Sequence, residues 1–182
     1  MGKYRKILVP LDGSSTADRG LDEAIRMAGL NNGRLRLLYV VDDLSVARAV
    51  EGAGTRAGAW QDDLQAEADA VLQRARARAV AGGVEADVCV RESSSGVVFE
   101  TILDEARRCA ADLIVMGTHG RRGIGRALLG SSAENVVRHA ELPVLLVRPA
   151  PGKPLPAAAQ TVPAVEPPLR HVRQPVGALS VE

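Results

Sequence analysis

The stretch from Gly117 to Ser132 combines residue types that are suited to binding an anion. Its glycines let backbone N–H groups approach a ligand closely, and a helical pattern begins where the stretch ends. A helix N-terminus supplies unpaired N–H groups and the positive end of a dipole. The residues concerned are Gly117, Gly120, Gly123, Gly125 and Gly130, with Arg121, Arg122 and Arg126, and with Ser131 and Ser132 at the end.

Phosphate is the natural ligand of such a cradle, and Ser131 and Ser132 could either donate hydroxyls to it or cap the helix. The alternative, which these residues leave open, is a flexible glycine-rich connection to a serine-capped helix. The common phosphate motifs do not decide between the two. The sequence has no GxxxxGK[ST] loop and no Rossmann fingerprint.

The elements around this stretch alternate between strand and helix. Buried strands are predicted over Lys6–Pro10, Leu35–Val41, Val84–Val90, Asp112–Gly117 and Pro143–Val147, the third with one face more exposed. Helical spacing of apolar residues runs from Ala17 to Ala28, from Trp60 to Ala79, from Val98 to Ala110 and from about Ser132 to His139. Residues 42–59 have no firm period, and we expect a partly ordered loop there.

This order predicts an α/β fold: a five-stranded open parallel doubly wound sheet, Rossmann-like, with helices on both faces. Ligands bind such sheets beyond the carboxyl ends of the strands. Asp12, Val40 and Met116 lie at those ends, and the glycine stretch follows Met116. The alternatives are an ordinary Asp-Gly turn for Asp12 and a core position for Val40.

Several segments resemble the UspA family of universal stress proteins: KILVPLDGS, LLYVVD, ADLIVMGTHGR and LPVLLVRP, in this order. The ATP-binding members carry Gly, two residues, Gly, nine residues, Gly, then Ser or Thr. Gly117, Gly120, Gly130 and Ser131 stand at that spacing. The resemblance covers roughly residues 3–149 and implies the fold of the adenine nucleotide alpha hydrolase-like proteins.

The resemblance also implies a role for each matching position. Pro10, Leu11 and Asp12 correspond to the segment whose acid meets the ribose, and Val40 to the position against the adenine. Met116 and Gly117 would flank the nucleotide. The phosphate-binding segment would consist of His119, Gly120, Gly130, Ser131 and Ser132. His119 could donate to a phosphate or fix the loop by bonding to backbone.

ATP, with Mg²⁺, is therefore the expected ligand. The sequence gives no metal ligand that we would assign, because Mg²⁺ is often held mainly by phosphate and water. The strand Pro143–Val147 is apolar, and an apolar edge strand invites pairing with another chain. The resemblance implies homodimers formed through it; the alternative is an edge covered by the tail.

Composition excludes several classes. Residues 1–149 hold equal numbers of acidic and basic residues, and the chain has only four aromatic residues, so nucleic-acid binding is not expected. No segment reads as a signal peptide or reaches roughly 18 apolar residues, which predicts a cytoplasmic protein without a membrane partner. Cys89 and Cys109 fit buried thiols in a reducing compartment.

The prolines mark a change in organisation, because residues 149–182 hold eight of the ten. We expect an α/β domain over residues 1–149 and a disordered or loosely attached tail over residues 150–182, which could also recruit a protein partner.

The leading functional hypothesis is a nucleotide-dependent stress-response switch without catalytic residues. One alternative is an ATP-using enzyme, whether a slow ATPase, a transferase or a pyrophosphatase, although the first loop reads LDGSST and lacks the SGGxDS of such enzymes. Another is an interaction module that binds no nucleotide.

Overall fold

The computed structural model describes residues 4–42, 57–93, 97–120 and 129–148, and from residue 63 onward it also describes the side chains of the second helix. The loop expected before Ala57, the three arginines of the glycine stretch and the tail lie outside the described residues.

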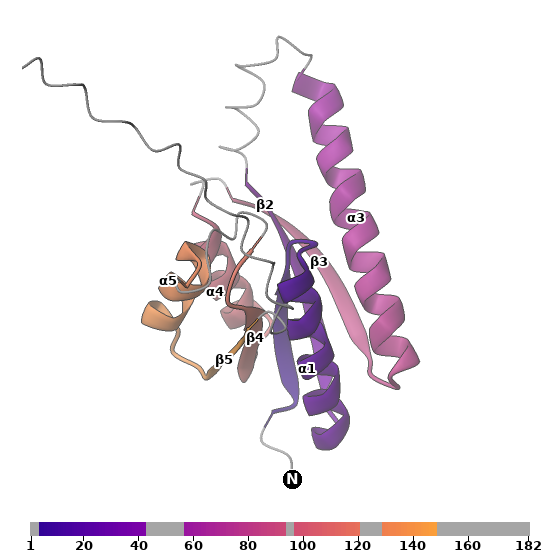
Figure 1. Cartoon of the computed structure of the whole chain (residues 1–182), viewed down its shortest axis with the longest axis vertical. Helices are drawn as coiled ribbons and strands as arrows, with labels where there is room; N and C mark the ends of the chain where they lie inside the picture. Colours follow the sequence, from indigo (N-terminus) through magenta and orange to yellow (C-terminus); the bar gives the residue numbers. More distant parts are fainter. Residues whose placement is uncertain (1–3, 43–56, 94–96, 121–128, 149–182) are drawn as a thin grey trace, which may run out of the picture. The chain divides into compact units, whose positions relative to one another are not determined.

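Strands and helices alternate along the chain as the sequence predicts (Figure 1). The strands are β1 (Lys6–Leu11), β2 (Arg34–Asp42), β3 (Ala86–Ser93), β4 (Leu113–Gly117) and β5 (Val144–Val147). The helices are α1 (Ser15–Asn31), α3 (Ala57–Ala81), α4 (Val98–Arg108) and α5 (Ser131–His139).

The five strands form one parallel sheet in the order β3-β2-β1-β4-β5, which confirms the predicted doubly wound fold. The chain builds outward from β1 to β3, then crosses to the other side of β1 for β4 and β5. The order therefore reverses between β1 and β4. In open sheets of this kind, a crevice forms beyond the carboxyl ends of the strands at such a reversal.

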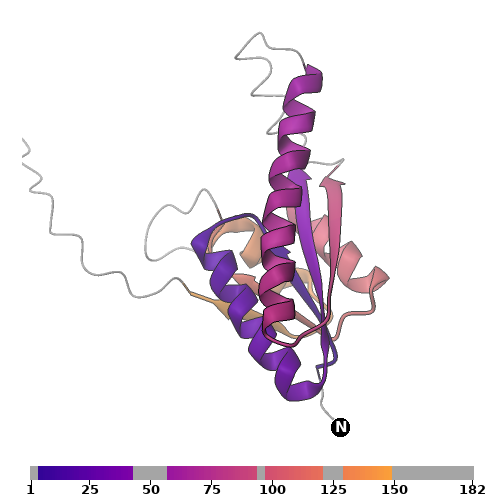
Figure 2. The same cartoon turned by 90° about the vertical axis from the view of Figure 1, so that its right-hand side faces the viewer.

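Helices α1 and α3 cover one face of the sheet and α4 and α5 the other (Figure 2). Side chains alternate between the two faces, so Ile7, Val9 and Leu11 face α1 and α3, whereas Leu8 faces α4 and α5. Both cores are almost entirely aliphatic, as the shortage of aromatic residues predicts. A parallel sheet needs this cover on both faces.

Local signals fix the two ends of α1. The Ser14 side chain accepts a hydrogen bond from the Ala17 N–H at 3.2 Å, which caps the helix start. Asn32 ends the helix in the left-handed conformation, with φ of 49°. The helix therefore begins immediately after the turn that carries Asp12.

Three predicted boundaries are wrong. Helix α3 begins at Ala57, inside the expected loop. Strand β3 begins at Ala86, since the Val84 N–H is donated to the Ala79 carbonyl and belongs to the turn that ends α3. Ala110 does not face the core: it is exposed, lies beyond the end of α4 and has a positive φ of 49°.

Within the described ranges, no helix combines the length and the apolar character that crossing a bilayer requires.

Candidate functional site

The turn after β1 places Asp12 beside Gly120. The Asp12 Oδ1 atom accepts a hydrogen bond from the Ser14 N–H at 3.0 Å, which fixes the carboxylate within the Asp-Gly turn. A Cβ atom at Gly120 would lie 2.6 Å from Asp12 Oδ2, closer than real Cβ contacts. The absence of a side chain at Gly120 therefore allows this carboxylate to approach the backbone of the glycine stretch.

Gly117 brings the end of β4 against the start of α1. A Cβ atom there would lie 2.9 Å from Thr16 Cγ2, 3.0 Å from the Thr16 carbonyl carbon and 3.1 Å from the Ala17 nitrogen. A Cβ atom at Gly20, one turn further along α1, would lie in ordinary contact with the Gly117 nitrogen, at 3.4 Å. The spaced glycine at position 117 thus has a packing role, since it allows a helix to approach the strand closely.

Thr118 connects the segment after β4 to two neighbours. Its N–H is donated to the Val147 carbonyl at the end of β5, and its carbonyl accepts the Gly130 N–H, both at 2.9 Å. Gly130 in turn lies so close that a Cβ atom would be 3.2 Å from the Thr118 oxygen. These contacts hold the start of α5 beside residues 118–120, although nine residues of sequence lie between Gly120 and Gly130.

The start of α5 differs in one respect from the prediction. Gly130 is the N-cap residue, without a side-chain capping bond, and Ser131 and Ser132 are the first two helical residues. The capping alternative for the two serines is therefore wrong. Gly130 offers no side chain to cap the N–H groups of the first turn, and the backbone donors of a helix start favour an anion.

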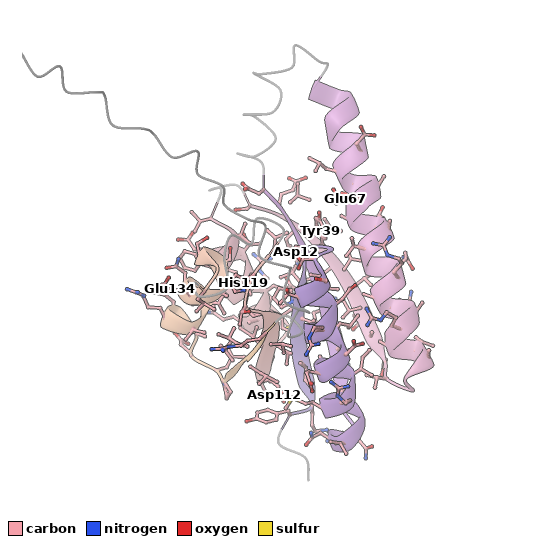
Figure 3. All side chains as sticks on the ribbon, viewed as in Figure 1. Asp12, Tyr39, Glu67, Asp112, His119 and Glu134 are labelled. Atoms are coloured by element: carbon pink, nitrogen blue, oxygen red, sulfur yellow. The ribbon has the colours of Figure 1, made fainter. Side chains whose placement is uncertain are left out.

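His119 lies at the same edge, and Figure 3 shows it with Asp12 at the opposite end of the sheet from Asp112. Its Nδ1 atom is 2.9 Å from the Thr118 hydroxyl, so a side chain, not backbone, holds the ring. Its Nε2 atom is buried and has no hydrogen-bond partner among the described residues.

We call Asp12, residues 117–120 and residues 130–132 the glycine edge. Its members come from the ends of β1 and β4 and from the start of α5, which the contacts above bring together. The register of β1 and β2 pairs Leu11 with Tyr39, so Val40 lies one step beyond that pair.

The predicted residues differ in exposure. Leu11, Met116 and Gly117 are buried, so their side chains or Cα atoms belong to the core. Gly120 and Ser131 are exposed. The half-buried members are Pro10, Asp12, Val40, His119, Gly130 and Ser132.

Thr118 was not among the predicted residues, although it is 6% exposed and its hydroxyl orients His119. The sequence offered one signal, since Thr118 is a polar residue directly after a fully buried strand. Its backbone partners lie on β5 and α5, which no local pattern reveals.

The fold and this edge define a class: an open α/β protein whose strand order reverses beside a glycine-lined helix start. The chain belongs to the universal stress protein family, whose model matches residues 3–148.

Individual relatives agree with this assignment. The chain is 35% identical over 149 residues to universal stress protein MJ0531 of Methanocaldococcus jannaschii, covering 80% of this chain and 82% of that protein.

Two solved structures also match. Protein MJ0577 of the same organism is 27% identical, with a TM-score of 0.71 over 82% of this chain and 99% of that one. A universal stress protein solved in complex with cAMP is 25% identical, with a TM-score of 0.60 over 80% of this chain and 98% of that one.

Proposed function

We propose that the glycine edge binds ATP and that the protein acts as a nucleotide-dependent switch in the stress response. The observation that carries this proposal is the close approach of Asp12, Gly120 and Gly130 at the reversal of strand order. A side chain at either glycine would fill the space that lies against the carboxylate or the Thr118 backbone.

The chemistry of the edge suits the parts of a nucleotide. N–H groups at the start of α5 suit the phosphates, and the Ser131 and Ser132 hydroxyls can add hydrogen bonds. The Asp12 carboxylate is an acceptor suited to ribose hydroxyls. Val40, one step beyond the last β1–β2 pair, offers an apolar surface to the adenine. The relative solved with cAMP supports an adenine nucleotide.

Mg²⁺ would accompany ATP and neutralise part of the phosphate charge. The described part of the chain contains no cluster of three or more His, Cys, Asp or Glu side chains that could hold a metal. Phosphate oxygens and water would therefore supply most of the Mg²⁺ ligands, as is common for this ion.

We assign no catalytic residue. Hydrolysis needs a base placed to activate water, and the Asp12 carboxylate at this edge already accepts the Ser14 N–H. ATP turnover should stay at the buffer background. Turnover well above it that Asp12→Ala abolishes would show instead that the protein is an enzyme.

Isothermal titration with ATP and Mg²⁺ tests the proposal. We expect saturable binding that Gly120→Val removes, since its side chain displaces Asp12, and that Ser131→Ala weakens about threefold to tenfold, the effect of losing one hydrogen bond. Gly29→Ala is the matched control, because a Cβ atom at Gly29 meets nothing within 4 Å. Absence of binding to folded wild-type protein would refute the proposal.

We also propose a homodimer formed through β5. This strand lies at the end of the sheet, and Val144, Leu145 and Leu146 are only half-buried. An apolar edge strand is a template for pairing with another chain. Sedimentation at micromolar concentration should show a dimer that ATP stabilises, and a monomer under all conditions would contradict this.

A further inference from the structure

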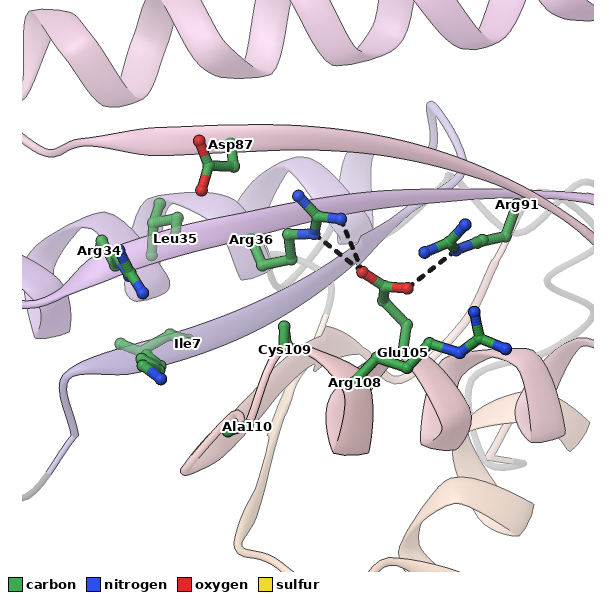
Figure 4. A pocket seen from close by; sticks show the side chains of 11 residues that line it. Ile7, Arg34, Leu35, Arg36, Asp87, Arg91, Glu105, Arg108, Cys109 and Ala110 are labelled. Carbon is green, nitrogen blue, oxygen red and sulfur yellow. Dashed lines mark hydrogen bonds and ion pairs between the residues drawn. The ribbon is translucent and has the colours of Figure 1, made fainter.

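A cavity of about 490 Å³ lies between α4 and the side of the sheet formed by β1, β2 and β3 (Figure 4). Five basic side chains line it, from Lys6, Arg34, Arg36, Arg91 and Arg108. The carboxylates in its lining are Asp87 and Glu105. We call this cavity the basic pocket.

The alternation of side chains along two strands creates the pocket. On β2, Leu35 and Leu37 belong to the core beneath α1 and α3, so Arg34 and Arg36 point to the opposite face. On β3, Val88 and Val90 pack against that same core, which turns Asp87 and Arg91 toward α4. The register pairs Arg36 with Asp87, so both strands present charged residues to one face.

Glu105 of α4 is the central acid of the pocket and is only 2% exposed. Its Oε1 atom lies 2.8 Å from Nη2 of Arg36, and its Oε2 atom lies 2.8 Å from Nε of Arg91. Burial alone would raise the pKa of Glu105, but the hydrogen bonds from Arg91 and Arg36 outweigh it and hold the pKa below its ordinary value. The ionised carboxylate has both oxygens engaged and offsets one of the two positive charges.

Acidic side chains balance the charges of the other three cations less well. Lys6, Arg34 and Arg108 form no ion pair with another described residue, and Asp87 is the one further acid in the lining. Clefts lined by one sign of charge concentrate counter-ions, because low-dielectric walls focus the field. The pocket therefore holds an excess of positive charge that a bound anion would neutralise.

We propose that the basic pocket binds a small metabolite that carries a phosphate group, at a site separate from the glycine edge. Lys6 and Arg34 are the first residues of β1 and β2, so the pocket opens toward the amino ends of these strands. The glycine edge lies at the opposite, carboxyl ends. Guanidinium groups donate hydrogen bonds in a fork that matches phosphate oxygens. A dianion also matches the surplus of cations, and the volume leaves room for an organic part, since ligand pockets begin at roughly 300 Å³.

The two cysteine thiols near the pocket are poorly suited to bind a ligand covalently. Cys109 lines the pocket, and Cys89 lies on the same face of β3. Burial raises the pKa of both thiols, with the negative charge of Glu105 as a second cause. Neutral thiols are poor nucleophiles, so the arginines, not the cysteines, would hold the ligand.

Amide NMR titration of the full chain with inorganic phosphate tests the proposal. At constant ionic strength, maintained with chloride, we expect saturable shifts at Arg34 and Ala110, which flank the pocket. Arg108→Gln should weaken this response at least about tenfold, the effect expected for a hydrogen bond to a charged group. Arg107→Gln is the control, because Arg107 pairs with Asp104 on the exposed side of α4.

Phosphate could also reach the glycine edge, so the titration is repeated with Gly120→Val, in which the pocket response should persist. Three results would overturn the proposal: shifts confined to residues 117–120 and 130–133, equal losses in Arg107→Gln and Arg108→Gln, or no saturation in protein whose spectrum shows it folded. Tighter binding of succinate than of phosphate would refute the choice of phosphate.

Discussion

Among the described residues of the glycine edge, the groups suited to an anion are chiefly backbone N–H groups at the start of α5, whereas five cationic side chains line the basic pocket. The edge owes its shape to missing side chains, since Gly117, Gly120 and Gly130 each allow a close approach. The pocket owes its character to long side chains, and Glu105 holds two of them in place. The two proposed anion sites thus differ in physical kind, although they lie on one sheet.

The difference predicts different selectivity. A site made of fixed backbone dipoles is rigid and depends on geometry, so one added methyl group should disrupt it. A site made of arginine side chains can adapt, and its strength depends on the balance of charge. Substitutions should therefore separate the two regions, with steric changes affecting the edge and charge changes affecting the pocket.

Gly117→Val should produce the largest effect and damage only the edge. The new side chain would press on the Thr16 side chain and on the backbone of Thr16 and Ala17, forcing α1 away from β4. Overpacking of this kind destabilises by about 3 kcal/mol, and ATP affinity should fall with it. Chemical denaturation measures the first effect and titration the second. Phosphate shifts at the basic pocket should survive in the folded variant; their loss would show that the two regions are not independent.

Glu105→Gln should act on the pocket and spare the edge. Removing one partner of a buried ion pair is strongly destabilising, but Arg36 and Arg91 are 30% and 40% exposed, so solvent softens the loss. We expect about 2 kcal/mol by chemical denaturation, with tighter phosphate binding because the competing carboxylate charge is gone. Asp104→Asn, in an exposed pair one residue away, should change stability by less than about 0.5 kcal/mol. An equal effect of both substitutions would contradict a special role for Glu105.

The pH dependence of stability should also reveal the contribution of Glu105. Because the folded-state pKa of Glu105 lies below its ordinary value of 4.5, its ionisation stabilises the fold fully above pH 4.5. That contribution is lost as the pH falls through the lower, folded-state pKa. The stability difference between wild type and Glu105→Gln should therefore be constant near neutrality and shrink below about pH 4.5. Denaturation series from pH 7 to pH 3 measure it, and a difference that grows in acid would contradict the assigned direction.

The sequence predicted that Asp12 and the glycine stretch share one end of the sheet, because these residues directly follow strands. A buried strand followed by Asp12, and another followed by spaced glycines, place both groups at one end of a parallel sheet. The open doubly wound sheet was predicted from the alternation of elements, whereas the order of its strands, with the reversal between β1 and β4, is known from the structure. Thr118 was missed since its bonds to Val147 and Gly130 join segments that only the folded chain brings together.

The basic pocket was out of reach for a related reason. Its arginines come from two strands and one helix, and each looks like an ordinary surface charge within its own segment. Glu105 was the least visible of all, because a glutamate within a helix is expected to be exposed. Only the tertiary fold, which buries Glu105 between Arg36 and Arg91, distinguishes it from Asp104.

Gly29→Ala should produce a smaller effect than Gly117→Val and Glu105→Gln, and its sign is opposite to that of Gly117→Val. Gly29 lies in α1, is exposed, and a Cβ atom there would meet nothing within 4 Å. Alanine is the better helix former by about 0.8–1 kcal/mol, so the variant should be more stable by up to that amount. Denaturation measures the gain, and ATP titration should show unchanged affinity. A loss of stability would contradict this expectation. It would show that the distance from an added Cβ atom to its neighbours does not by itself separate the glycines that tolerate a side chain from those of the edge that do not.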